Sequence, residues 1–159
     1  MKTVRHAIPV LFGLCMACLT MAQQQSPSQP KKLVNTDSQG VGAHGYDPVA
    51  FFTEGKALKG DPRYQTSYGG AIYYFTSSAD KAAFEKEPAK YVPQYGGHCA
   101  MAMTMGKLED VDPNYFVVDD GKLLLQRNEK AHMMFAKDVK GNHKKADQNW
   151  AKLQQTASN

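Results

Sequence analysis

The residues most capable of chemistry lie together in one stretch, YGGHCAMAMTMG, from Tyr95 to Gly106. Its centre, 98–105, places a histidine, a cysteine and three methionines within eight residues. Thiolate and thioether sulfur are soft ligands that select Cu(I), and imidazole suits either oxidation state of copper. The stretch therefore predicts a soft-metal site, a reactive thiol, or a sulfur-rich piece of hydrophobic core.

The spacing within this stretch limits how much of a metal site it supplies by itself. In a strand, Cys99 and Met105 lie about 20 Å apart at roughly 3.3 Å per residue, so the sulfur ligands on that face cannot all reach one ion. In a helix, His98, Met101 and Met105 share one face. Either conformation brings only neighbouring ligands together, so further ligands must come from elsewhere. The sequence leaves strand and helix both open.

Four residues are the candidate metal ligands: Cys99, His98, Met101 and His44. We expect Cys99 to be the principal ligand, and His44 to be the best remote histidine. Copper is the metal expected if one binds. Structural zinc takes four His or Cys ligands, and only His98 and Cys99 lie close together.

Two other interpretations of Cys99 remain open. Methionine and free cysteine are common core residues, and five of the eight methionines follow residue 22, which fits a structural or protein-interaction domain. Alternatively, Cys99 is the nucleophile of a thiol-dependent enzyme. Neighbouring residues of a strand point to opposite faces, which is a poor arrangement for a Cys99–His98 pair. A non-catalytic protein is therefore the favoured interpretation.

The N-terminus has the pattern of an export signal. A basic start, MKTVRH, precedes an apolar run and a small residue at Ala22. This predicts a cleaved signal peptide over 1–22 and a periplasmic or secreted protein, with a lipoprotein cleaved before Cys18 as the alternative. The apolar run is too short for a membrane span, so we expect no transmembrane segment in the mature chain. Residues 23–39 are polar and contain prolines, which predicts a disordered linker.

The mature chain is small and nearly neutral. Removal of 22 of the 159 residues leaves 137, a length that suits one domain. The 19 basic residues lose Lys2 and Arg5, which leaves 17 against 15 acidic residues, a net charge of +2. This balance predicts no nucleic-acid partner. We expect a metal ion or a small ligand as the partner, and the sequence indicates no particular protein partner.

The segment from residue 40 to residue 155 is expected to form one small α+β domain. Gly69-Gly70 and Asp120-Gly121 each lie between β-prone runs and predict two hairpins. Val49 to Thr53 is apolar and also β-prone. We expect a small antiparallel sheet built from the two hairpins and covered by about three helices.

Three segments have the pattern of those helices. Ser77 with Asp80 forms a capping box before a run of helix formers, and Pro88 ends the run. The segments 128–138 and 141–155 have apolar residues at helical spacing. The apolar positions expected to pack on the sheet are Ala131, Met134, Phe135, Ala146, Trp150 and Leu153.

Several motifs resemble the YHS-domain family. They are GYDPVAFF from Gly45, GAIYYFTSSADKAAFEKEPAKYVPQYGGHCA from Gly70, the DGKLLL strand, and the A..NW..L tail. The resemblance spans Gly45 to Leu153. Within the family, it is more specific to the exported single-domain members. YHS domains are also attached to copper-transporting ATPases and some oxygenases and are described as metal-binding modules. The resemblance therefore implies metal binding.

The resemblance does not extend to the cysteines of the metal-binding relatives. In those relatives, cysteines follow the Asp-Pro-Val segment and flank the aromatic strand. The corresponding positions here are Ala50, Thr76 and Ala79, which cannot bind a metal. Only Cys99, within YGGHCA, matches what the exported branch keeps. The resemblance supports Cys99 as a ligand and gives no support to the three methionines.

Overall fold

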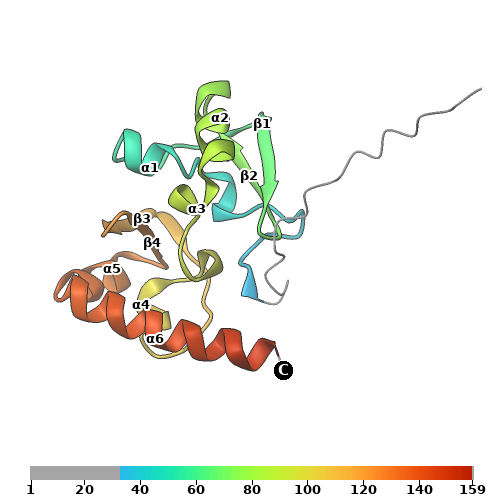
Figure 1. Cartoon of the computed structure of the whole chain (residues 1–159). Coiled ribbons are helices and arrows are strands. Elements are labelled where there is room, and N and C mark those ends of the chain that lie inside the picture. Colours follow the sequence, from blue (N-terminus) through green and yellow to red (C-terminus); the bar gives the residue numbers. More distant parts are fainter. Residues whose placement is uncertain (1–32, 159) are drawn as a thin grey trace, which may run out of the picture.

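The computed structural model describes residues 33–158 (Figure 1). Its elements, in chain order, are α1 (Ala50–Thr53), β1 (Asp61–Tyr68), β2 (Ala71–Phe75), α2 (Ser78–Lys86), α3 (Pro88–Tyr91), α4 (Ala100–Met103), β3 (Asp112–Asp119), β4 (Lys122–Gln126), α5 (Glu129–Ala136) and α6 (Val139–Ala157). In Figure 1, hairpin β1–β2 lies in the upper part with α1, α2 and α3. Hairpin β3–β4 lies below with α4 and α5, and α6 runs along the bottom.

The α+β class and both hairpins are confirmed. Strands β1 and β2 pair up to Tyr68 and Ala71, and strands β3 and β4 pair up to Asp119 and Lys122. Each hairpin is closed by two residues that both have positive φ, as a type I′ turn requires. Glycine meets this requirement at both positions of the first turn and at the second position of the other turn.

The hairpins form two separate two-stranded sheets rather than one joined sheet. Connecting segments form backbone hydrogen bonds with β2 and β4, at positions that a neighbouring strand would occupy in a joined sheet. Beside β2, Gly42 N–H donates to the Ile72 carbonyl (2.9 Å), and Ile72 N–H donates to the Gly40 carbonyl (2.8 Å). On β4, the Leu123 carbonyl accepts from Gln94 N–H (2.9 Å). These bonds satisfy backbone groups that would otherwise be unpaired.

The three predicted helices are α2, α5 and α6. Each begins at a residue whose side chain accepts from the backbone N–H three residues further on, namely Ser77, Asn128 and Asp138. Their core positions are mostly those expected, since Ala131, Phe135 and Ala146 are buried. Met134 is the exception, because its exposed fraction is 44%.

The β-prone run Val49–Thr53 is not a strand, because residues 50–53 form the helical turn α1. A buried carboxylate explains the difference. Asp47 Oδ1 accepts from the backbone N–H groups of Val49 (2.8 Å) and Ala50 (3.3 Å), which satisfies donors at the start of a helix. This contact outweighs the β-propensity of a short run.

The same carboxylate also joins two distant segments. Asp47 is completely buried, and its Oδ2 accepts from Thr76 N–H at 2.7 Å, just after β2. Burial raises the pKa of Asp47, and the three N–H donors act in the opposite direction. One side chain therefore fixes the start of α1 against the end of β2.

Replacing Asp47 with alanine is expected to lower the free energy of unfolding by about 2–4 kcal/mol, because three backbone N–H groups lose their acceptor. Asp47→Asn should cost less, because its oxygen still accepts at α1 while its amide N–H opposes Thr76 N–H. Urea denaturation measures both losses, with Glu54→Ala as a matched control at an exposed acid. A loss no larger than that of the control would contradict this role for Asp47.

Residues 33–39, assigned to the linker from sequence, lie against the domain. Leu33 is buried, and Asn35 N–H donates to the Gly96 carbonyl at 2.8 Å. A Cβ on Gly96 would lie 2.0 Å from the Leu33 carbonyl oxygen, so this approach requires glycine. The expected signal peptide and the rest of the expected linker lie outside the described residues. Within residues 33–158, no helix is both long and apolar enough to cross a membrane.

Candidate functional site

The sulfur-rich stretch forms a turn followed by one turn of helix. Tyr95, Gly96 and Gly97 all have positive φ, which reverses the chain before the extended residues His98 and Cys99. Helix α4 then starts at Ala100 and ends at Met103. His98 precedes the helix, so it does not share the helical face of Met101 as the fully helical alternative required.

Cys99 is completely buried and is held by a buried glutamine. Its thiol donates to Gln126 Oε1 at 3.7 Å, and the same oxygen accepts from Met101 N–H at 3.1 Å. Gln126 is also completely buried, and its Nε2 has no hydrogen-bond partner within the described chain. Cys99 N–H donates to the Glu109 carbonyl at 2.9 Å. The sulfur atom thus lies beside a polar amide inside an apolar core.

Cys99 also lines a cavity of about 270 Å³, which we call the sulfur pocket. Four sulfur-bearing side chains line it, from the start of α4, from the chain after it, and from α5: Cys99, Met101, Met105 and Met134. Met134 comes from a helix more than thirty positions away in sequence. The sulfur pocket therefore gains one additional soft side chain, Met134, that the short stretch could not provide by itself.

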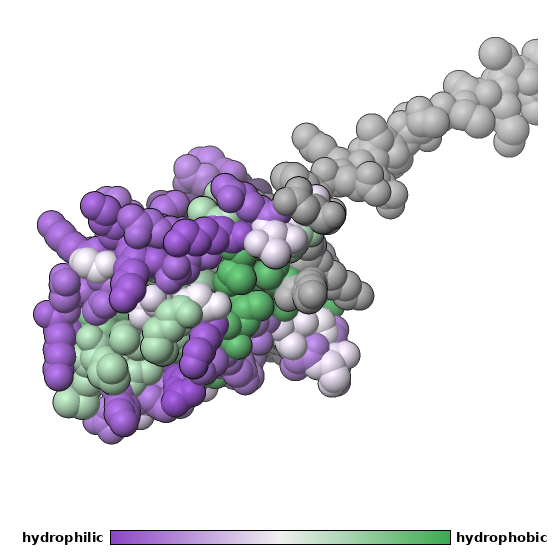
Figure 2. Space-filling view, turned by 90° about the horizontal axis from the view of Figure 1, so that it is seen from below, coloured by the Kyte–Doolittle hydropathy of each residue, from purple (hydrophilic) through white to green (hydrophobic). Residues whose placement is uncertain are grey.

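The methionines differ in how far solvent reaches them. Met105 is 58% exposed and Met134 44% exposed, whereas Met101 is half-buried. Figure 2, which views the molecule from below, shows a pale green apolar area bordered by purple hydrophilic side chains on one face. The exposed methionines form the mouth of the sulfur pocket and the buried thiol forms its floor.

The charged residues around the sulfur pocket are mostly basic. Arg127 forms an ion pair with Glu109, which offsets one positive charge. Lys107 and Lys130 also line the pocket and form no ion pair within the described chain. The mouth therefore carries an excess of positive charge.

The two predicted histidine ligands lie elsewhere, near Asp110. His44 Nε2 lies 2.8 Å from Asp110 Oδ1, and the His44 side chain is 42% exposed. Asp110 Oδ1 also accepts from Asn35 Nδ2 at 2.9 Å. Neither His44 nor His98 lines the sulfur pocket. Of the four predicted ligands, the structure brings together Cys99 and Met101 and separates both histidines from them.

His98 has an unusual environment. Both ring nitrogens are buried, and neither has a hydrogen-bond partner within residues 33–158. Burial lowers the pKa of His98, while the nearby Glu109 carbonyl and the Asp110 charge oppose that shift only in part. Burial therefore favours the neutral form of the ring. Across the described residues, no group of three or more His, Cys, Asp or Glu side chains could hold a metal ion.

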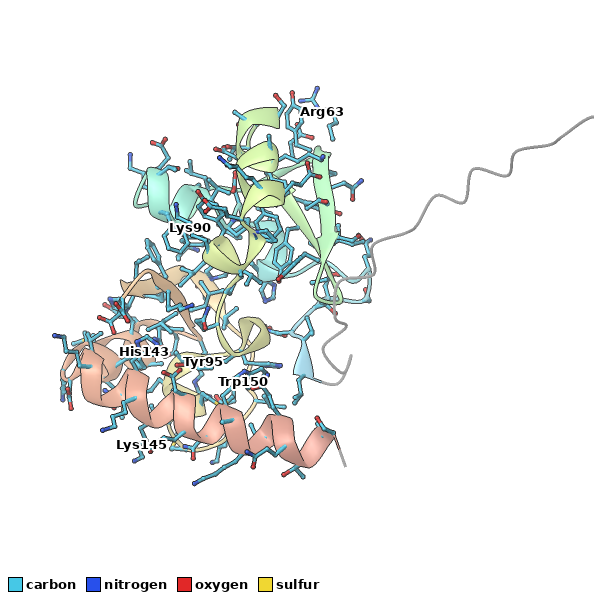
Figure 3. The ribbon with its side chains drawn as sticks, viewed as in Figure 1. Arg63, Lys90, Tyr95, His143, Lys145 and Trp150 are labelled. Atoms are coloured by element: carbon cyan, nitrogen blue, oxygen red, sulfur yellow. The ribbon has the colours of Figure 1, made fainter. Side chains whose placement is uncertain are left out.

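Another polar cluster ties α6 to the rest of the domain. His143 Nδ1 lies 2.7 Å from Asp119 Oδ2, and the Tyr95 hydroxyl donates to Asp147 Oδ1 at 2.9 Å. Figure 3 shows Tyr95 and His143 on the side of α6 that faces the other elements. Burial and the bond to Asp147 raise the pKa of Tyr95, so its hydroxyl stays a donor. These contacts are internal to the cluster, which indicates a structural role.

Sequence reasoning missed Met134 and Gln126 as parts of the site. The helical spacing predicts that Met134 packs on the sheet. The adjacent pair Met133-Met134 is the sequence feature that could have indicated a further sulfur ligand. Gln126 ends β4 and has no local pattern that marks it as buried. Both reach Cys99 or its pocket through the packing of β4 and α5 on α4, which spacing alone does not predict.

The fold and site describe a small α+β protein with a sulfur-lined pocket. Residues 49–95 match the model of the family described as YHS domain, which supports assigning this segment of the chain to the YHS-domain family. The match runs from α1 to the turn at Tyr95 and ends four residues before Cys99. No curated protein and no solved structure matches the chain. Membership of the exported branch stays a prediction.

Acidification is expected to destabilise the protein in part through His98. The unfolded chain binds a proton there with the ordinary pKa of 6.5, whereas the folded protein has a lower value. The unfolded state thus binds more protons below about pH 6.5, and stability present above that pH is lost as the pH falls. His98→Gln should flatten the fall in unfolding free energy between about pH 7.5 and pH 5. An unchanged pH slope would contradict this account.

The Cys99 thiol is expected to react with a bulky disulfide reagent at least about tenfold more slowly in the native protein than in urea, because reaction requires local opening. Absorbance of the released aromatic thiol follows the reaction. Equal rates in the two states would show that the thiol is accessible and would favour the thiol-enzyme interpretation.

Proposed function

We propose that this protein is a non-catalytic module that binds Cu(I) in the sulfur pocket. The observation that carries the proposal is the convergence of one cysteine and three methionines on a single cavity. Thiolate and thioether ligands together favour Cu(I) over harder ions. The YHS match and the metal-binding role implied by the resemblance point the same way.

The charge of the pocket favours a monovalent ion. Metal binding requires loss of the Cys99 proton, and the resulting thiolate neutralises one positive charge. A divalent ion on the thiolate would leave a net positive charge at the buried Cys99 sulfur, in a pocket that the exposed Lys107 and Lys130 also line, and burial makes uncompensated charge costly. A Cu(I)–thiolate unit is neutral and suits an apolar, sulfur-lined site.

The path to Cys99 passes the exposed methionines. Met105 and Met134 present thioethers at the mouth, and methionine has three rotatable bonds that let it move aside or rotate its sulfur inward. The Gln126 Oε1 that accepts from the Cys99 thiol also accepts from Met101 N–H, so this oxygen keeps a backbone donor when the thiol loses its proton. An ion would thus be captured at the mouth and transferred to the thiol.

The two alternative functions have less support. A thiol enzyme needs a base at the cysteine, and the only side-chain hydrogen bond of the Cys99 sulfur within the described residues is to the Gln126 amide oxygen. A purely structural role accounts for the burial of Cys99 among Phe51, Val111 and Leu125. It gives no reason for two exposed methionines over the same cavity. Export to the periplasm or outside the cell remains part of the proposal.

Titration with Cu(I) against a coloured competing chelator tests this function. The unmodified protein is expected to bind one Cu(I), Cys99→Ala to lose that binding, and Met134→Leu to bind roughly tenfold or more weakly. Met133→Leu is the matched control, because Met133 is 59% exposed and does not line the pocket. Failure to compete for one equivalent of Cu(I), or equal affinity in Cys99→Ala, would overturn the proposal and favour the structural role.

A further inference from the structure

A second cavity lies between hairpin β1–β2 and α6 and shares no lining residue with the sulfur pocket. Its volume is about 240 Å³, and we call it the aromatic cavity. Four aromatic side chains line it, two from hairpin β1–β2, one from the turn before His98 and one from α6: Tyr68, Tyr73, Tyr95 and Trp150. Figure 3 shows Tyr95 and Trp150 near each other beside α6. Ligand sites commonly occupy such junctions between packed units.

The shape and lining of the aromatic cavity suit a small planar ligand. The Tyr95 and Trp150 ring centroids lie 6.1 Å apart with planes at 68°, an edge-to-face pair. The other apolar side chains of the lining are Val34, Ala89, Val92 and Pro93. The volume lies below the roughly 300–1,000 Å³ of sites for drug-sized molecules, so the ligand is smaller, with one or two rings.

One hydroxyl that lines this cavity has no hydrogen-bond partner within the described residues. Tyr73 is 3% exposed, and its hydroxyl makes no hydrogen bond within the described residues. This hydroxyl is therefore free to donate to an acceptor placed in the cavity. The Tyr95 hydroxyl is not available, because it donates to Asp147.

Lys122 supplies a positive charge to the lining of the aromatic cavity. It is the one charged side chain among the lining residues, and it has no ion-pair partner in the described part of the chain. A carboxylate accepts hydrogen bonds from both an ammonium group and a phenol, and such charge-assisted bonds are the stronger ones.

We propose that the aromatic cavity binds a small aromatic carboxylate. The ring of the ligand packs among Tyr68, Tyr73 and Trp150, and its carboxylate accepts hydrogen bonds from Lys122 and from the Tyr73 hydroxyl. The inference is independent of copper binding, because the two cavities are lined by different residues.

Benzoate is the probe that tests this site, by calorimetry and by the fluorescence of Trp150, the only tryptophan in the chain. We expect saturable binding at millimolar concentration, with a matching change in emission, and much weaker binding of the neutral analogue benzamide. Lys122→Gln and Tyr73→Phe should each weaken benzoate binding roughly tenfold, which corresponds to about 1.4 kcal/mol. Cys99→Ala should bind benzoate as the unmodified protein does.

Matched controls separate this site from nonspecific association. Lys145→Gln makes the same charge change on α6, away from the cavity (Figure 3), and Tyr64→Phe removes a hydroxyl that does not line it. Both should leave the benzoate affinity unchanged. No saturable binding, equal binding of benzamide, or equal losses in Lys145→Gln and Lys122→Gln would each overturn the proposal. Circular dichroism of every variant confirms that it is folded.

Discussion

The segment between the two hairpins holds the domain together. A two-stranded hairpin alone is marginally stable in water, so neither sheet is expected to persist without this connection. The Gln94 N–H binds the Leu123 carbonyl of one hairpin, and the Gly96 carbonyl accepts from Asn35. Further along the same segment, Cys99 N–H donates to the Glu109 carbonyl. The chemically distinctive residues lie within this connection, so their positions depend on the packing of both halves.

This arrangement places both cavities where separate units meet. The sulfur pocket forms where α4 and α5 come together near the end of β4, and the aromatic cavity forms between hairpin β1–β2 and α6. A polar group without a hydrogen-bond partner within the described residues lies at each cavity: the buried Gln126 Nε2 beside the sulfur pocket, and the Tyr73 hydroxyl that lines the aromatic cavity. The buried Gln126 amide costs stability unless a hydrogen-bond partner satisfies it. The family match covers most of the upper half, while Cys99 and Met134 lie beyond it.

Local signals predicted most of the fold, and long-range contacts decided the rest. Glycine pairs and side-chain caps depend on a few adjacent residues, so both hairpins and the three longer helices follow from sequence. Helix α1 does not follow from the sequence because the buried Asp47 at its start is fixed by a bond from Thr76 N–H, which lies 29 positions away. The site was predicted only in part. Cys99 and Met101 share a pocket, but no spacing rule places Met134 beside them or His44 beside Asp110.

The exposure of the pocket methionines has a consequence for redox chemistry. Thioethers that solvent reaches are also reached by oxidants, and oxidation to the sulfoxide turns a soft, apolar side chain into a polar one. Met105 and Met134 are open to this change, whereas Met103 is completely shielded in the neighbouring core. Peroxide would therefore alter the mouth of the sulfur pocket before it disturbed the packing beneath. Reductive repair of the sulfoxides would restore the pocket without refolding.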